Sequence, residues 1–576
     1  MQITNFQGTM PRTPDKKLSN NIGITAQNCD TSDGQLNPYK DVSLVESVVK
    51  AGAIKSSFRC DDIWLSWLNI VDIVKAEGIK TDSRIYYTGD GYPKMTYKAL
   101  AITQGIASDY PTAYRLGVES PAVALTVTTS EIASGEAYGD DYLTVSYTYT
   151  YISFISDSYT EESAPAPPTP AYNISDNMKV TLTGFVDPAG AGNNVIYYRV
   201  YRTAVTSSGI VEEFQLVPYG RDSSGAYIYD IPVAVTSFVD LDEDSDPKTL
   251  YQDLSEAIST EGWDNLPDTA TGLTQYQNGI LAAIYDQSVL ISKAFYPYAF
   301  PRGINDSSID YSYDFEYYPR HLASYRDMLI VGTDANPYIL TGSDPEFLNK
   351  SKLAFNEACV GPMLVTEIGA IYPSTDGLVL CDGITVAPMT TDTFSKEHWQ
   401  ALGPEDLKMF YYKNKILGFF KGSGTGFSYD FKQTKTIETT LLSNGLLFYD
   451  GHLVEEDGKL FLLVSDSSSS NYSIYQWEGS SSIVDQTWEG YIHERDAALF
   501  SLVRVDGDFS SNKSLVLTLT VDEVVLTTIT IENDNPYWLP SGYRFKDLKY
   551  KFVGKTIVDS IYFGYSRNDL YEGMDR

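Results

Sequence analysis

Residues 280–295, ILAAIYDQSVLISKAF, hold two short apolar runs around a polar turn. The same arrangement returns in four later segments: MLIVGTDANPYILTG, AIYPSTDGLVLCDG, MFYYKNKILGFF and KLFLLVSDSSSSNYSIYQW. The five units begin near residues 280, 328, 370, 409 and 460, a spacing typical of the four-stranded blades of a β-propeller. Because a single blade has two apolar faces and cannot cover both alone, we expect these units to stack side by side within residues 246–478.

The segment before these units, residues 119–245, predicts a β-sandwich. In YLTVSYTYTYIS, residues 142–153, large side chains alternate with Thr and Ser, which is a strong strand pattern. The prolines of TEESAPAPPTPA, residues 160–171, lack N–H donors, so we expect an extended edge or a crossover there. Strands resume in MKVTLTGF and VIYYRVYRT, and this series favours an immunoglobulin or fibronectin type III-like module.

The two ends of the chain complete a mainly β, multidomain prediction. Residues 1–118 indicate a β-rich docking or platform segment, in which DIWLSWLNIVDIV fits either a helical stripe or two strands. Its β-forming composition favours strands. Residues 479–576 predict a second small β-sandwich, which could also close the propeller.

Two short helices interrupt the β pattern. The first is expected in SDPEF, residues 343–347, with Ser343 or Asp344 as N-cap. The second is expected in FSKEHWQAL and ends at Gly403 and Pro404.

Charge and composition exclude some classes of protein. The chain has 576 residues with 76 acidic and 42 basic side chains, a net charge of −34, which argues against a broad nucleic-acid-binding surface. The 45 tyrosines suit recognition surfaces, although they also suit half-buried sheets. The opening sequence MQITNFQGTMPRTPDKK has no apolar signal segment, and no run of about 20 apolar residues follows, so we expect folding in a cytoplasm.

The residues that could hold a metal ion are scattered. The four cysteines form no CxxC pair and predict buried, reduced thiols: Cys29, Cys60, Cys359 and Cys381. The four histidines lack the spacing of a metal site: His321, His398, His452 and His493. The run DLDEDSD places Asp240, Asp242 and Asp244 as in a calcium loop, but Ser245 and Tyr251 replace the required Gly and Glu. A solvated loop is the expected structure, and no metal or cofactor is predicted.

No local motif predicts catalysis. GSGTGF, residues 422–427, lacks the Lys-Ser/Thr pair of a phosphate loop and predicts a hairpin turn. STDGLVL has Ser374, Asp376 and Gly377 in the order of an Asp-box but lacks its aromatic closure, so a blade turn is expected. No GxSxG elbow is present, and abundant carboxylates single out no acid/base pair. We therefore predict no catalytic, cofactor-binding or metal residues and no enzymatic activity.

Several segments in order give the chain a resemblance to a known family. They are ITNFQGTMPR, AQNCDTSDGQLNPYK, RIYYTGDGYPKMT, YPTAYRLGVESPA, YTYISFISDSYTEESAPAPP, YYRVYRT, MLIVGTDANPYILTGSDPE, ACVGPMLVTEIGAIYPSTDGLVL and FSKEHWQAL. In this order the chain resembles the tail nozzle, or tail-tube, virion proteins of short-tailed bacteriophages over most of its length. Beyond about residue 430 the match is weak.

This resemblance implies a structural role. It implies a hexameric ring below the portal and adaptor proteins, beside tail fibres or spikes, that holds the packaged genome and conducts DNA during ejection. The host envelope would meet its distal end, and the protein would be located in the virion tail after synthesis in the bacterial cytoplasm. An acidic lumen would let DNA slide without specific binding, because like charges repel.

Two other classes of protein remain as alternatives. A glycan-binding or glycan-cleaving surface protein is one, because propellers joined to fibronectin-like modules also occur in carbohydrate enzymes. A receptor-binding tail fibre is the other, although the chain has none of the heptad repeats that such fibres often contain.

Overall fold

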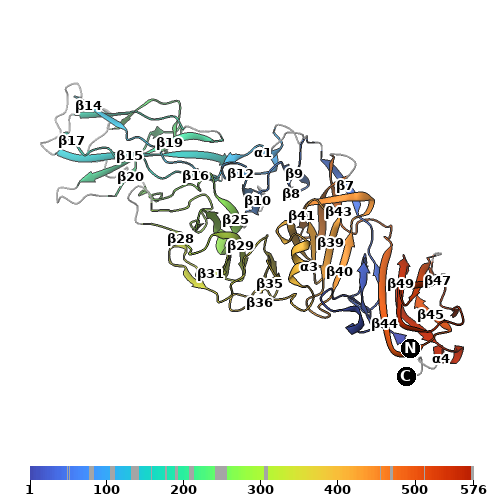
Figure 1. The fold of residues 1–576 in the computed structure, drawn as a ribbon. Helices are drawn as coiled ribbons and strands as arrows, with labels where there is room; N and C mark the ends of the chain where they lie inside the picture. Colours follow the sequence, from blue (N-terminus) through green and yellow to red (C-terminus); the bar gives the residue numbers. More distant parts are fainter. Residues whose placement is uncertain are drawn as a thin grey trace.

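The computed structural model describes the 576-residue chain apart from residues 49, 51, 77–83, 104–110, 132–141, 157–158, 176–177, 189–191, 206–212, 241–255, 304–308, 455, 467–470, 511–512 and 572–576. Strands dominate, and they gather in several sheets along an elongated molecule (Figure 1). The prediction of a mainly β, multidomain protein is confirmed. None of the helices in the described residues is long and apolar enough to cross a membrane.

The five repeated units form five blades of four antiparallel strands each. Their strands are β25 (Thr271–Gln275), β26 (Leu281–Tyr285), β27 (Ser288–Ile291) and β28 (Ser312–Asp314); β29 (Pro319–Tyr325), β30 (Met328–Thr333), β31 (Tyr338–Thr341) and β32 (Asn349–Lys352); β33 (Leu364–Thr366), β34 (Gly369–Ser374), β35 (Gly377–Cys381) and β36 (Val386–Pro388); β37 (Leu407–Tyr412), β38 (Lys415–Phe420), β39 (Thr425–Tyr429) and β40 (Ile437–Leu441); and β41 (Leu446–Val454), β42 (Lys459–Asp466) and β43 (Tyr472–Gln476) with β7 (Ser43–Val48). Strands β34 and β38 are buried along their whole length because neighbouring blades cover both faces.

A sixth blade comes from the N-terminal segment. It consists of β10 (Asp72–Lys75), β11 (Ile85–Thr88), β12 (Lys94–Thr96) and β13 (Tyr114–Arg115). A two-stranded hairpin of β8 (Ser56–Cys60) and β9 (Ile63–Trp67) precedes it. The ambiguous stretch DIWLSWLNIVDIV therefore forms two strands, β9 and β10, as its composition favoured.

The six blades and the hairpin follow one another around a ring (Figure 1). Innermost strands of successive sheets contact each other in the order β10, β25, β29, β33, β37, β41 and β8. The hairpin completes the ring, because Cys60 and Trp67 share an apolar core with Ile85 and Tyr87 of the sixth blade. The N-terminal strand β7 is the outermost strand of the last blade and pairs with β43, so the ring is closed by strands from both parts of the chain.

The predicted sandwich is inserted between two blades, after β13 and before β25. One sheet holds β14 (Thr126–Glu131), β18 (Met178–Thr183) and β24 (Ser237–Asp240). The other holds β15 (Tyr142–Ser156), β16 (Tyr159–Glu162), β17 (Tyr172–Ser175), β19 (Val195–Val205), β20 (Gln215–Leu216) and β23 (Ile231–Pro232), and a separate hairpin joins β21 (Gly220–Arg221) to β22 (Tyr227–Ile228). The proline-rich segment runs along β15 as an extended edge, with Ala166 and Thr169 donating backbone N–H groups to Tyr149 and Tyr147.

A second sandwich lies at the C-terminal end. Its sheets are β44 (Gln486–Ala498), β49 (Phe545–Gly554), β46 (Leu515–Val521) and β47 (Val524–Ile531), packed on β1 (Gln2–Ile3), β50 (Val558–Gly564), β45 (Leu502–Gly507) and β48 (Tyr537–Trp538). Trp488, Phe552 and Phe563 are buried between these two sheets. The predicted C-terminal sandwich is present, and it contains an N-terminal strand.

Strand pairing crosses the expected boundaries at residues 118 and 478. Strand β4 (Thr25–Gln27) lies between β40 of the propeller and β44 of the C-terminal sandwich, so one continuous sheet joins the two bodies. Strand β2 (Gln7–Thr9) pairs with β3 (Ile22–Gly23) and with β40, and β5 (Cys29–Asp30) pairs with β6 (Asn37–Pro38). The N-terminal segment therefore shares its strands with both neighbouring bodies.

Both predicted helices are present in short form. A 3₁₀ turn, η3 (Pro345–Phe347), follows Asp344, whose carboxylate accepts the N–H of Glu346. Helix α3 (Lys396–Ala401) follows Ser395, which accepts the N–H of His398, and Gly403 ends it with a left-handed φ of 73°. The remaining α-helices of the described residues are α1 (Lys98–Ala101) and α4 (Arg567–Tyr571).

Candidate functional site

Charged side chains from several blades meet where the innermost strands of the propeller converge. Asp450 on β41 accepts the backbone N–H of Ser57 on β8 at 2.8 Å and forms an ion pair with Lys408 on β37. The carboxylate is 5% exposed, so both partners are needed to compensate its charge. Three adjacent sheets of the ring are thus joined at one carboxylate.

A second carboxylate lies across the same centre. Asp72, at the start of β10, accepts the backbone N–H of Gly272 on β25 at 2.8 Å. Burial raises its pKa, while the Gly272 N–H and the ammonium groups of Lys408 and Lys421 partly oppose this rise. Lys421 follows β38; burial lowers its pKa, Lys408 lowers it further, and Asp450 and Asp72 act in the opposite direction. The charges of these groups therefore affect one another's pKa between blades of the ring.

Two histidines face the same charges. His321 is on β29, and burial together with Lys421 and Arg320 lowers its pKa to about 4. His452 is on β41, and burial together with Lys408 lowers its pKa to about 4 against the effect of Asp450. Both rings are therefore neutral near pH 7, where neither adds to the positive charge of the lysines.

We call Asp72, His321, Lys408, Lys421, Asp450 and His452 the axial cluster. Its members come from four of the blades, and Ser57 adds the hairpin. The contacts of these side chains join innermost strands of the ring, and their charges also affect one another's pKa between blades that are not adjacent.

The other end of the innermost strands carries a hollow of about 630 Å³. Val365 of β33, Tyr411 and Tyr412 of β37, and Leu453 of β41 lie in its wall. Lys413 is the charged group among the described residues that line it. The hollow therefore offers aromatic and apolar surface but no pair of carboxylates.

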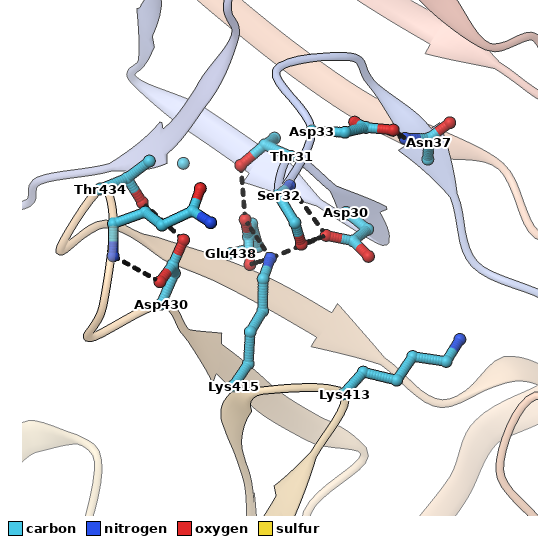
Figure 2. Close-up of polar contacts among 12 residues, drawn as sticks. Asp30, Thr31, Ser32, Asp33, Asn37, Lys413, Lys415, Asp430, Thr434 and Glu438 are labelled. Atoms are coloured by element: carbon cyan, nitrogen blue, oxygen red, sulfur yellow. Dashed lines mark hydrogen bonds and ion pairs between the residues drawn. The ribbon is translucent and has the colours of Figure 1, made fainter.

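A third polar cluster ties the N-terminal segment to the propeller. Figure 2 shows Lys415 of β38 reaching Asp30 and Glu438, while Lys413 points away. The Lys415 ammonium lies 2.8 Å from Asp30 and 3.0 Å from Glu438, and Thr31 donates its hydroxyl to Glu438 at 2.6 Å. We call Asp30, Thr31, Lys415 and Glu438 the N-terminal tie.

Burial and charge oppose each other in the N-terminal tie. Glu438 is fully buried, and this burial raises its pKa although Lys415 acts against the rise. Burial alone would lower the pKa of Lys415, but Glu438 and Asp30 outweigh it and raise that pKa. Lys415 occupies the space between the carboxylates, so this cluster is an internal ion pair that holds two segments together.

The sequence motifs lie where ordinary β-structure would place them. GSGTGF forms the turn after β38 and the first three residues of β39, and STDGLVL turns from β34 into β35 with Ser374 accepting the N–H of Asp376. All four cysteines are buried and free, as predicted. His398 lies in α3, and His493 on β44 contacts Asp547.

The acidic run beginning at Asp240 lies mostly outside the described residues. Asp240 itself is buried and binds Arg202 and the Tyr147 hydroxyl inside the inserted sandwich. No group of three or more His, Cys, Asp or Glu side chains with metal-binding geometry occurs among the residues that the structure describes.

Sequence reasoning missed the axial cluster. One sequence feature could have pointed to it: a single charged residue interrupts an apolar innermost strand. Examples are VDIV at Asp72, LKMF at Lys408 and YDGH at Asp450. A charge within a doubly buried strand needs a partner, so its presence predicts a polar contact at the centre. The partner could not be identified without the ring geometry.

Comparison with known proteins gives no family. Neither a known family nor a curated protein matches this sequence. Among solved structures, an exo-β-1,3-galactanase from Phanerochaete chrysosporium is 8% identical over 51% of this chain and 95% of its own, with a TM-score of 0.20.

Two further solved structures are similarly distant. The WD40 domain of Pan2 from Neurospora crassa is 9% identical over 53% of this chain and 87% of its own, with a TM-score of 0.23. BamB from Moraxella catarrhalis is 8% identical over 53% of this chain and 93% of its own, with a TM-score of 0.23. At these values the likenesses carry no argument about function; the propeller-like architecture rests on the sheets described above.

Proposed function

We propose that this chain is a tail nozzle subunit of a short-tailed bacteriophage. Six copies would form a ring whose acidic central channel retains the packaged genome and conducts DNA during ejection. The ring would sit below portal and adaptor proteins, beside fibres or spikes, and its far end would meet the host envelope. The subunit would be made in the bacterial cytoplasm and function in the virion without catalysis.

The uneven distribution of charge carries this proposal. Residues 119–245 contain 18 acidic and 4 basic side chains, whereas residues 1–118 contain 12 acidic and 13 basic ones. The inserted sandwich is thus strongly acidic, and it projects from one end of the molecule (Figure 1). A ring that points six such sandwiches towards its lumen would repel DNA phosphates and prevent sticking.

The axial cluster bears on where DNA could pass. Asp450 ties β41 to β8 and β37, and Asp72 ties β10 to β25, so we place the duplex outside a single propeller. The channel would instead lie between copies, as in any closed ring built from heterologous contacts.

Antibody-gold electron microscopy on particles from the producing culture tests this function. Gold at the end of a short tail is the expected result, and an antibody against a capsid protein provides the control. Particles without label, together with free antigen in the medium, would contradict the proposal. The purified chain should also show negligible, salt-insensitive affinity for duplex DNA; tight salt-dependent binding would refute the acidic lumen.

A glycan-cleaving role is a second candidate, favoured by the two carboxylates of the axial cluster. Asp72 has a raised pKa, as an acid catalyst requires, whereas Asp450 is held beside Lys408. Release of reducing ends from host capsule or lipopolysaccharide, abolished in Asp72→Asn but not in Asp376→Asn, would support it. Absence of release by the wild-type chain would exclude it for those glycans.

A further inference from the structure

The C-terminal sandwich has one side that faces away from the propeller. On the opposite side, β44 pairs with β4 and connects the sandwich to the propeller. On the free side the two sheets end at β47 and β48, which only five residues separate in sequence. The Tyr537 hydroxyl on β48 accepts the N–H of Glu532, the residue after β47, at 3.0 Å and so holds the two strands near each other.

Strand β47 presents an open edge. In the described part of the chain it pairs with β46 alone, so its other edge has no partner strand. Its sequence, VVLTTITI, contains no charge and no proline, and it consists almost entirely of β-branched residues. Val524 and Val525 are 69% and 61% exposed.

Natural proteins protect such edges with lysine, proline or a covering segment. The outer strand of one blade shows this protection: β32 has the sequence NKSK, with Lys350 and Lys352 along the edge. Strand β47 has no equivalent within its eight residues. An unprotected edge with free N–H and C=O groups is a surface to which another strand can add.

Trp538 lies beside this edge. It is on β48, whose own outer edge is also unpaired among the described residues, and it is 66% exposed. Exposed tryptophan is a frequent anchor at protein interfaces because it buries a large area at low entropic cost. Backbone edge and aromatic anchor thus lie on the same side of the sandwich.

The charges around β47 indicate what would bind. Exposed acidic residues flank the strand at both ends, with Asp522 and Glu523 before it and Glu532 and Asp534 after it; the Glu523 carboxylate also pairs with Lys549 at 3.0 Å. Two copies of β47 paired antiparallel about a twofold axis would place Glu523 opposite Glu532 at both ends. Because like charges across a strand pair are destabilising, the favoured occupant is a strand with basic flanks.

We propose that the edge of β47, with Trp538 beside it, is the docking site for an extended strand of a partner polypeptide that carries Lys or Arg at both ends. The added strand would extend the sheet β44-β49-β46-β47 by main-chain hydrogen bonds. Its flanking cations would face the carboxylates at the two ends of β47. This surface belongs to the chain whatever its role in a virion, so its test is independent of the tail function.

The experiment uses the full chain and two synthetic peptides of equal charge. The probe peptide alternates Val and Thr between two Lys residues at each end, and the control peptide has Pro in place of its central Val. Fluorescence anisotropy should show binding of the probe, and binding at least about tenfold weaker for the control, because proline removes a ladder donor. Amides of residues 524–531 should exchange more slowly when the probe is bound.

Matched variants locate the site. Val525→Lys should weaken binding of the probe at least about tenfold, and Ile384→Lys, the same change of charge on an exposed propeller loop, should leave it unchanged. Trp538→Ala, which inserts no charge, should also weaken binding, and unchanged melting temperatures exclude misfolding.

Three outcomes would overturn the proposal. Equal binding of both peptides would mean that charge attraction alone, without main-chain pairing, accounts for the binding. Equal binding by wild type and Val525→Lys would place the contact elsewhere. Concentration-dependent protection of residues 524–531 without peptide would make a second copy of this chain the occupant.

Discussion

Replacement of Lys415 by Met should detach the N-terminal segment from the propeller. Lys415 is the cation between Asp30 and Glu438, and Glu438 is fully buried. Removing one partner of a buried ion pair leaves an uncompensated charge, which costs about 3–5 kcal/mol. Asp30 is partly exposed and can be hydrated, so most of this loss falls on Glu438.

Hydrogen exchange measures this loss locally. A multidomain chain has no single unfolding free energy, whereas the amides of β4 and β5 report the opening of the N-terminal segment itself. We expect these amides in Lys415→Met to exchange faster by about two to four orders of magnitude at pH 8. Burial raises the pKa of Glu438, and without Lys415 its carboxyl takes up a proton more easily, so the effect should be smaller at pH 5.

Lys413→Met is the matched control. Lys413 is two residues away, is exposed, and pairs with Glu478 at 2.6 Å, so its loss should cost less than about 1 kcal/mol. The double variant Lys415→Met/Glu438→Gln has no buried charge and should recover at least half of the lost protection. Equal effects of the two lysine variants, or a double variant as unprotected as Lys415→Met, would refute this reasoning.

Three further predictions concern other parts of the chain. Burial raises the pKa of Glu161 to about 7, so the stability given by its neutral form is present at pH 4 and is lost as pH rises through about 7. Melting curves between pH 5 and 8 should show this fall in stability, and the fall should be smaller in Glu161→Gln. The four buried thiols should react with a thiol reagent only after denaturation, as mass spectrometry would show. Gly403→Ala should cost about 1–2 kcal/mol, because φ is 73° there, and faster hydrogen exchange of the amides at the end of α3 would detect it.

The alternation of side chains made most strands predictable. In β15 Tyr147 and Tyr149 face the apolar core, whereas Thr148 between them faces the other side of the sheet and donates its hydroxyl to the Ala166 carbonyl; a period of two predicts this alternation directly. The five blades were predictable because each repeats the same hairpin within a short distance. These are local features, and local propensity agrees with the tertiary structure.

The ring closure was not predictable in the same way. Strand β7 (SLVESV) carries a charge at Glu46 and leaves Leu44 and Val45 exposed, so its sequence gives no sign of the blade it completes. Its partner β43 is more than 400 residues away. The axial cluster and the N-terminal tie depend on such distant pairings, and periodicity carries no information about them.

The position of the N-terminal strands has a consequence for folding. Strand β7 cannot find β43, nor β4 its partner β44, until nearly five hundred residues have been synthesised. Contacts of such sequence separation form slowly, because the entropy of loop closure must be lost before they stabilise the chain. Until then the last blade lacks its outer strand and β40 lacks β4, so both edges stay open to wrong pairing. The N-terminal tie opposes this, because the buried Lys415–Glu438 pair lacks one carboxylate contact and one hydroxyl donor until Asp30 and Thr31 have arrived. The tie therefore favours the correct register of the N-terminal segment over others, at the junction where the propeller and the C-terminal sandwich become one sheet.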